Sequence, residues 1–227
     1  MNVKNPSSPT DARTAERHLA IGYAPADARD GLAALIALDE RLGAIVRSTR
    51  EPMVGQMRLT WWHEALERLD DAPAPAEPVL ADIAATVIGD TVKGRDVAAM
   101  IDGWEALLDG EVADDQVLAT HARARGGQLF VLAGRLSGAG DEPLIAAGEG
   151  WALADVAANL SDPAAAMRAK LGARERLEEV FARRWSRPAR GLGALTLIAT
   201  MDVAPELRPP GHPLRLARLV LHRLTGR

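Results

Sequence analysis

EPMVGQMRLTWWHEALERLD, residues 51–70, is the stretch that decides the fold class of this chain. Pro52 suits the first turn of a helix, where its missing N–H leaves no hydrogen bond unmade. Two apolar stripes at helical spacing follow it: Met53, Met57 and Trp61 in one, and Leu59, Trp62, Leu66 and Leu69 in the other. An apolar face of this width is too broad for a surface helix, so we expect a largely buried helix.

Apolar residues recur at helical spacing over most of the remaining chain. We predict further helices at 10–20, 27–47, 79–89, 95–109, 114–136, 143–160, 173–185, 192–201 and 214–227. The Pro/Ala stretch DAPAPAEP, residues 71–78, is typical of a short link between helices. Aromatic residues make up only 4% of the chain, and strand patterns are weak. These features predict an all-α protein with a disordered tail at residues 1–9 and a single helical domain at 10–227.

Composition excludes several classes of protein. The chain has no cysteine, so disulfides and thiolate metal sites are ruled out. No apolar run reaches the roughly 18 residues that span a bilayer, and the polar start MNVKNPSSPT does not resemble a signal peptide. The net charge of −4 gives no reason to expect nucleic acid as a partner. We therefore expect a cytoplasmic protein that does not bind nucleic acid.

Charge is distributed unevenly along the chain. Residues 168–227 contain 13 basic and 5 acidic residues, a balance of +8. The first 167 residues carry 14 basic and 26 acidic residues, a balance of −12. One interpretation is that the two parts attract each other in the fold. The other is that the basic C-terminal third faces a protein partner or an anionic membrane surface, as at the inner membrane.

Gly126-Gly127 interrupts the predicted helix at 114–136. Two glycines inside a helix cost about 2 kcal/mol relative to two alanines. Such a cost indicates close helix packing, a kink, or a ligand against bare backbone. Of these we favour close packing.

Several segments of this chain resemble the squalene/phytoene synthase family. ALIALDERLGAIVRSTREPMVGQMRLTWWHEALERL resembles the first motif region, and is most similar to a divergent branch that includes a mitochondrial complex I assembly factor. ARARGGQLFVLAGRLSG, GEGWALADVAANL and PPGHPLRLARLVLHRL resemble later segments, so the resemblance spans about residues 15–224. It implies an isoprenoid-synthase-like helical bundle around a central apolar cavity.

Active members of that family condense two prenyl diphosphates with Mg²⁺, which the family binds through paired D-x-x-x-D motifs on facing helices. Carboxylates at i and i+4 lie on one helix face and can share a metal cluster. In this chain the first motif is replaced by Gly43, Ala44 and Arg47, with Asp39 one turn earlier. The second keeps the spacing in Asp155 and Asn159, with only one carboxylate. The resemblance therefore implies a member without the acidic pairs.

These residues define the expected site and the alternatives for function. Cavity or remnant-motif residues are Asp39, Arg47, Gln56, Arg58, Trp61, Trp62, Asp155 and Asn159. We expect a non-catalytic protein that acts by binding, with respiratory complex assembly as the most concrete version and with no metal or cofactor. The alternatives are a prenyl diphosphate-condensing transferase, which would need Mg²⁺, and an isoprenoid or lipid carrier. Carboxylates that converge on one pocket near Asp39 and Asp155 would favour the transferase.

Overall fold

The structure is a computed structural model that describes residues 9–109 and 114–227. These residues form helices joined by turns and no strand, which confirms the predicted all-α class. In chain order the elements are α1 (Pro9–Ile21), α2 (Arg29–Ser48), α3 (Pro52–Glu67), η1 (Arg68–Asp70), α4 (Pro78–Thr86), α5 (Gly94–Ala98), α6 (Ile101–Asp109), α7 (Asp115–His121), η2 (Ala122–Gly127), α8 (Gln128–Ser137), α9 (Leu144–Asn159), α10 (Pro163–Leu177), α11 (Arg190–Asp202) and α12 (Pro213–Thr225).

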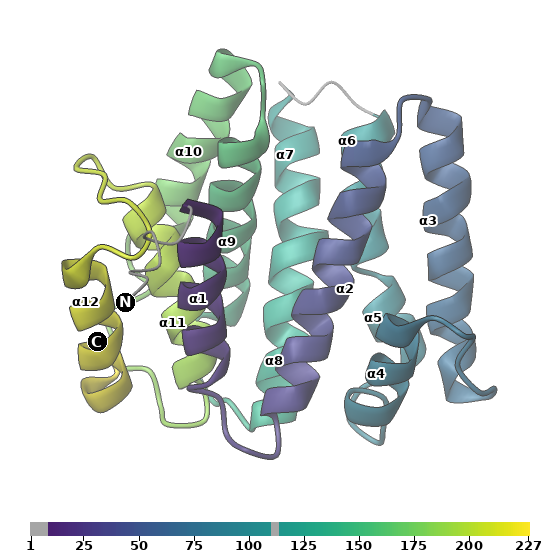
Figure 1. Cartoon of the computed structure of the whole chain (residues 1–227), viewed down its shortest axis with the longest axis horizontal. Coiled ribbons are helices and arrows are strands. Elements are labelled where there is room, and N and C mark those ends of the chain that lie inside the picture. Colours follow the sequence, from purple (N-terminus) through teal and green to yellow (C-terminus); the bar gives the residue numbers. More distant parts are fainter. Residues whose placement is uncertain (1–8, 110–113) are drawn as a thin grey trace, which may run out of the picture.

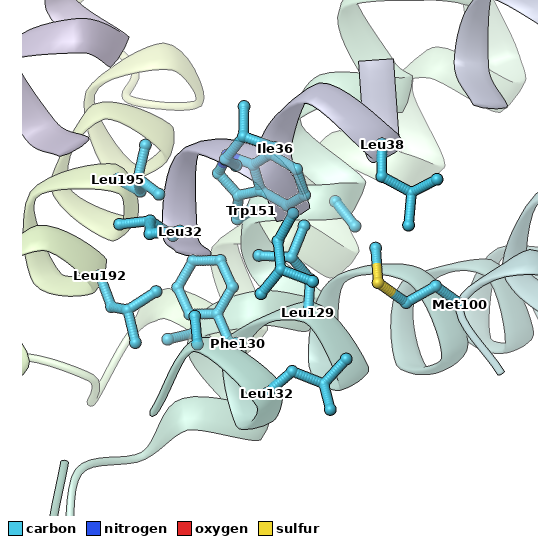
Figure 2. Packing of buried hydrophobic residues seen from close by; sticks show 14 of the residues in the cluster. Leu32, Ile36, Leu38, Met100, Leu129, Phe130, Leu132, Trp151, Leu192 and Leu195 are labelled. Atoms are coloured by element: carbon cyan, nitrogen blue, oxygen red, sulfur yellow. The ribbon is translucent and has the colours of Figure 1, made fainter. Parts of the chain in front are cut away.

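The long helices stand side by side as a bundle, with α3 at one edge and α12 at the other (Figure 1). Helix α9 lies between α10, α11 and η2, and α2 packs against α4, α6 and α8. The core fills the space between α2, α8, α9 and α11, where Figure 2 shows the labelled residues Leu32, Ile36, Phe130, Trp151 and Leu195 close together. This arrangement places the middle of α9 opposite the middle of α2.

The helix at 52–67 is only half buried, so the expected burial of both apolar stripes is wrong. The stripe of Leu59, Trp62, Leu66 and Leu69 is buried. The stripe beside it is not, because Met53, Met57 and Trp61 are 72%, 68% and 45% exposed. Helix α3 forms the edge of the bundle and packs on α5 and α6, so only one of its faces is covered.

The helix predicted at 173–185 begins ten residues earlier and ends at Leu177. Its start is fixed by Asp162, whose carboxylate accepts hydrogen bonds from the backbone N–H groups of Ala164 and Ala165. Pro163 then occupies the first turn. Residues 178–189 form turns, and the indole of Trp185 donates to the carbonyl of Val180 at 3.0 Å. The charged pattern predicted the helix type correctly but placed its bounds too late.

The glycine pair lies where two helices touch. Residues 122–127 form a π-helical turn inside the run from α7 to α8, which gives this segment the irregularity that the glycines predict. A Cβ on Gly126 would lie 2.0 Å from the carbonyl oxygen of Gly148 on α9, a distance that no side chain tolerates. Close helix packing therefore explains Gly126, whereas a Cβ on Gly127 would meet nothing nearer than 3.6 Å.

Ion pairs join the acidic and basic parts of the chain. Glu16 on α1 binds Arg215 on α12 at 2.7 Å, and Glu149 on α9 binds Arg176 on α10 at 2.6 Å. These contacts support the interpretation that the two parts attract each other.

The predicted connector and tail complete the chain. Residues 71–77 form turns and extended backbone between η1 and α4, as the Pro/Ala composition predicts. The predicted disordered tail lies outside the described residues apart from Pro9, where α1 begins. In the part of the chain that the structure describes, the helices are all too short or too polar to cross a membrane.

Candidate functional site

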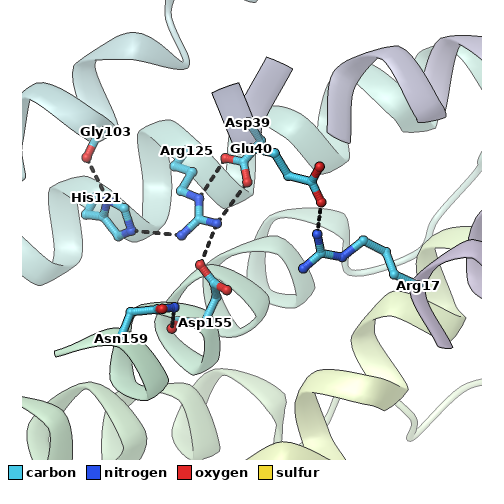
Figure 3. A network of polar contacts seen from close by, with 8 residues as sticks. All are labelled: Arg17, Asp39, Glu40, Gly103, His121, Arg125, Asp155 and Asn159. Carbon is cyan, nitrogen blue, oxygen red and sulfur yellow. Dashed lines mark hydrogen bonds and ion pairs between the residues drawn. The ribbon is translucent and has the colours of Figure 1, made fainter. Parts of the chain in front are cut away.

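A buried arginine joins the two helices that were expected to carry the acidic motifs. Arg125 on η2 donates from Nε and Nη2 to the two carboxylate oxygens of Asp39 on α2, at 2.7 and 2.8 Å. The same Nη2 donates to Asp155 on α9 at 2.7 Å. Figure 3 shows the guanidinium between the two carboxylates. Asp39 and Asp155 thus converge, but on a cation that the chain itself supplies.

Aromatic rings and a histidine complete the surroundings of Arg125. Its guanidinium carbon lies 4.2 Å from the ring centre of Trp104 and 4.8 Å from that of Trp151, distances typical of cation–π contacts. Arg125 also donates from Nη1 to Nε2 of His121 at 3.2 Å, while Nδ1 of His121 donates to the carbonyl of Gly103 at 2.6 Å. Those two bonds require a neutral His121 with its proton on Nδ1.

Burial and charge act together on the pKa values of this cluster. Burial and then the charge of Arg125 lower the pKa of His121 to about 3, so the ring is neutral at pH 7. Burial alone would raise the pKa of Asp155, but the attraction and hydrogen bond of Arg125 outweigh it and hold that pKa below its ordinary value. Burial alone would lower the pKa of Arg125, and Asp39 followed by Asp155 raises it instead. Arg125 is therefore a permanent cation.

The donors at this site do not fit a Mg²⁺ cluster. Such a cluster needs several carboxylate oxygens free to coordinate. Both oxygens of Asp39 and one oxygen of Asp155 are already bonded to Arg125, whose positive charge would repel a metal ion. Within residues 9–109 and 114–227, no three Asp, Glu or His side chains lie close enough together to hold a metal ion.

Asn159 and Arg47 lie near the motif positions but outside the cluster. The amide of Asn159 donates to the backbone carbonyl of Asp155 at 2.8 Å, one turn back on its own helix. Arg47 is exposed, and its guanidinium lies beside Gly43. Glu40, next to Asp39 in sequence, points away from the cluster and pairs with Arg17 (Figure 3). These two neighbouring acids therefore point in different directions, and only Asp39 belongs to the cluster.

The predicted residues of α3 do not reach the cluster. Gln56 is half-buried, and Arg58 is exposed with Nη1 donating to the hydroxyl of Thr49 at 3.4 Å. Trp62 is a core residue, and Trp61 meets it edge to face with ring centres 5.5 Å apart. The tryptophans at the site are Trp104 and Trp151 instead. The expectation of Trp61 as core and cavity wall is corrected, because its helix is at the edge of the bundle.

Sequence reasoning missed Arg125 and His121, although a signal for both was present. They lie four residues apart, at the helical spacing that places them on the same buried side as Leu118, Leu129 and Phe130. A charge on the apolar side of a helix needs a buried partner of opposite sign. Asp39 stands in the same position among Leu35, Leu38 and Leu42 on α2. Pairing these out-of-place charges would have predicted the contact.

The space beside the cluster is narrow and partly polar, unlike the apolar cavity that the resemblance implies. A small cavity of about 40 Å³ reaches Asp155 and is also lined by Arg13, Arg17, Trp151 and Asp202. A wider surface groove of about 660 Å³ adjoins it, sharing Arg13, Ala154 and Asp202. The floor of this groove is apolar, and basic residues are among those that line it. The groove is lined by residues of α1, α9 and α10 and of the segment 202–210.

Comparison with known proteins gives one match. A family model described as squalene/phytoene synthase matches residues 11–169, which is more than half of the chain. The matched range includes Asp39, Arg125 and Asp155. No curated protein and no solved structure matches the chain.

Proposed function

Because the chain belongs to the squalene/phytoene synthase family, we propose that it is a non-catalytic member of that family that acts by binding. The observation that carries the proposal is the position of Arg125. Its guanidinium occupies the space between Asp39 and Asp155 and takes up the carboxylate oxygens that a metal ion would need from these two residues. A buried guanidinium held by two carboxylates is costly to displace, because its removal leaves both charges without a partner.

The convergence of Asp39 and Asp155 keeps the transferase as a second candidate function. A direct test incubates the full chain with farnesyl or geranylgeranyl diphosphate and Mg²⁺ and measures released pyrophosphate. We expect no release above a protein-free control. Release that is abolished by Asp155→Asn, with folding unchanged by circular dichroism, would establish the transferase and overturn the non-catalytic proposal.

The groove beside the cluster supports an amphipathic, negatively charged ligand such as an isoprenoid or lipid. Its apolar floor includes Met167, Val203 and Leu207, and its cations are Arg13, Lys170 and Arg208. An apolar floor with a few convergent charges is the usual composition of a ligand site. A carrier of such molecules would need no metal, which agrees with the donor set around Arg125.

Native mass spectrometry of the purified protein tests the carrier. We expect a co-purifying lipid or isoprenoid that is lost in the variant Lys170→Glu/Arg208→Glu. Arg58→Glu is the matched control, since Arg58 is exposed on α3 and lies outside the groove-lining residues. Absence of any bound lipid from the native protein counts against this version.

A role in respiratory complex assembly is the cellular form of the proposal. Its support is the resemblance of residues 51–66 to the assembly-factor branch, together with the exposed face that α3 carries over the same residues. A cytoplasmic location, or one peripheral to the inner membrane, is consistent with that role. Deletion of the gene should lower complex I activity, and normal activity in the deletion strain would exclude assembly.

A further inference from the structure

The last helix of the chain is packed with its apolar side outward. Helix α12 buries Arg215, Leu219 and His222. Its large apolar side chains are exposed to solvent instead: Leu214 by 56%, Leu216 by 38%, Val220 by 49%, Leu221 by 54% and Leu224 by 73%. We call these five residues the outer face of α12. Helices of water-soluble domains normally turn such a face to the core, whereas this face has no packing partner among residues 9–109 and 114–227.

The inversion has a structural cause. Arg215 is held inside by Glu16, with Nη2 donating at 2.7 Å, and by Asp202, at 2.8 Å from Nη1. His222 is buried between Phe181 and the carbonyl of Arg190. Both anchors sit on one side of the helix and fix its rotation. The leucines therefore cannot turn inward without breaking a buried ion pair.

The charged residues around α12 indicate what kind of partner binds the outer face. Residues 207–227 contain five arginines and no acidic residue. Arg218 and Arg227 are exposed on α12 and just beyond it. A second exposed apolar stripe, on α3, has charges of both signs around it, including Glu51, Arg58 and Glu64. The outer face of α12 differs from that stripe, because the charged residues within Pro213–Thr225 are all arginines. The nearest acid along the chain is Glu206, which lines a pocket together with Leu214 and Arg218. Exposed leucines flanked by arginines on one helix are the pattern of a helix lying in an anionic lipid interface.

We propose that the outer face of α12 docks the protein on a membrane containing anionic lipid, with the helix lying in the plane of the interface. The leucines and Val220 enter the acyl boundary, while Arg218 and Arg227 reach the headgroups. This docking is independent of whether the groove binds a ligand or the cluster is catalytic. It would bring the protein to a lipid surface without a spanning helix.

Flotation of the full chain with vesicles tests the proposal. Vesicles of phosphatidylcholine alone are compared with vesicles of phosphatidylcholine and phosphatidylglycerol. We expect binding to the anionic vesicles that weakens with added salt. The variant Val220→Glu/Leu224→Glu should reduce that binding at least tenfold, and Arg218→Ala/Arg227→Ala should remove the preference for anionic lipid.

Met53→Glu/Met57→Glu is the matched control, because it adds the same two charges to exposed apolar positions of α3. It should bind vesicles as the native chain does. The proposal would be overturned if the native chain did not bind vesicles, or if the α12 variant bound them as well as the native chain does. It would also be overturned if the α3 control lost as much binding as the α12 variant. A native dimer that the α12 variant dissociates, without vesicle binding, would assign this face to a second copy instead. Circular dichroism establishes that each variant is folded.

Discussion

Arg125 is the residue on which the centre of the bundle depends. It is 3% exposed and bonded to Asp39, Asp155 and His121. Arg125→Met should lower the free energy of unfolding by about 3–5 kcal/mol, because Asp39 is left buried without its counter-charge. Urea denaturation measures the change. The double variant Asp39→Asn/Arg125→Met should be less destabilised than Arg125→Met alone.

Arg135→Met provides the control for that prediction. Arg135 lies on α8 and pairs with Asp96 at 3.6 Å, but its side chain is 46% exposed. An exposed ion pair contributes at most about 1 kcal/mol. Equal destabilisation by the two substitutions would contradict a central role for Arg125.

His121 makes the stability of the protein depend on pH. Its pKa in the folded state is about 3, below the ordinary value of 6.5, so the unfolded chain binds the proton more readily. The contribution of His121 is fully present above pH 6.5 and is lost as the pH falls toward 3. Linkage predicts a loss of about 2 kcal/mol between pH 7 and pH 5. Urea denaturation at both pH values measures it.

Two further variants separate His121 from the other histidines. His121→Gln should reduce the loss of unfolding free energy between pH 7 and pH 5. It should not abolish that loss, because burial also lowers the pKa of His222, and a lowered histidine pKa makes the folded protein less stable as the pH falls. His63→Gln is the comparison variant, because His63 lies partly exposed on α3, outside the buried cluster. An unaltered pH dependence in His121→Gln would show that the ring is protonated without cost.

The π-helical turn is the element that brings Arg125 into place. Gly126→Ala should cost at least about 3 kcal/mol, because its Cβ would meet the carbonyl of Gly148 at 2.0 Å and push η2 away from α9. Gly127→Ala should be neutral or stabilising by up to about 1 kcal/mol, since its Cβ has room and alanine favours helix. Thermal denaturation compares the two. Similar melting temperatures would contradict the packing argument.

At the scale of single helices, the sequence predicted where most helices lie but predicted less well which of their faces are exposed. Periodicity placed most helices because spacing along one helix is a local property. It could not say that α3 and α12 stand at the edges, since that depends on which neighbours the whole bundle supplies. The contact of Arg125 with Asp39 joins residues 86 positions apart, and only the packing of three helices brings them together. Asp155 was found through its motif spacing, whereas its partner was not.

On the scale of the whole molecule, a second buried ion pair joins the first and last helices. Glu16 and Arg215 are 1% exposed each and bond through both carboxylate oxygens. Glu16→Ala should lower the free energy of unfolding by about 3–5 kcal/mol and speed amide hydrogen exchange in α1 and α12. Glu40→Ala is the control, because the ion pair of Glu40 with Arg17 lies at the surface. It should change the free energy of unfolding by at most about 1 kcal/mol. Unchanged exchange in α12 would show that Leu219 and His222 hold the helix without the ion pair.

The same ion pair has a consequence for how the chain is made. Glu16 and Arg215 are separated by 199 residues. At the usual pace of about 5–20 residues per second, a ribosome needs on the order of 10 to 40 s to travel from one to the other. During that interval Glu16 keeps its water shell, because its partner Arg215 has not yet been made. Newly synthesised molecules therefore reach their final form only after Arg215 has emerged, and until then Glu16 lacks the arginine that balances its charge in the folded protein.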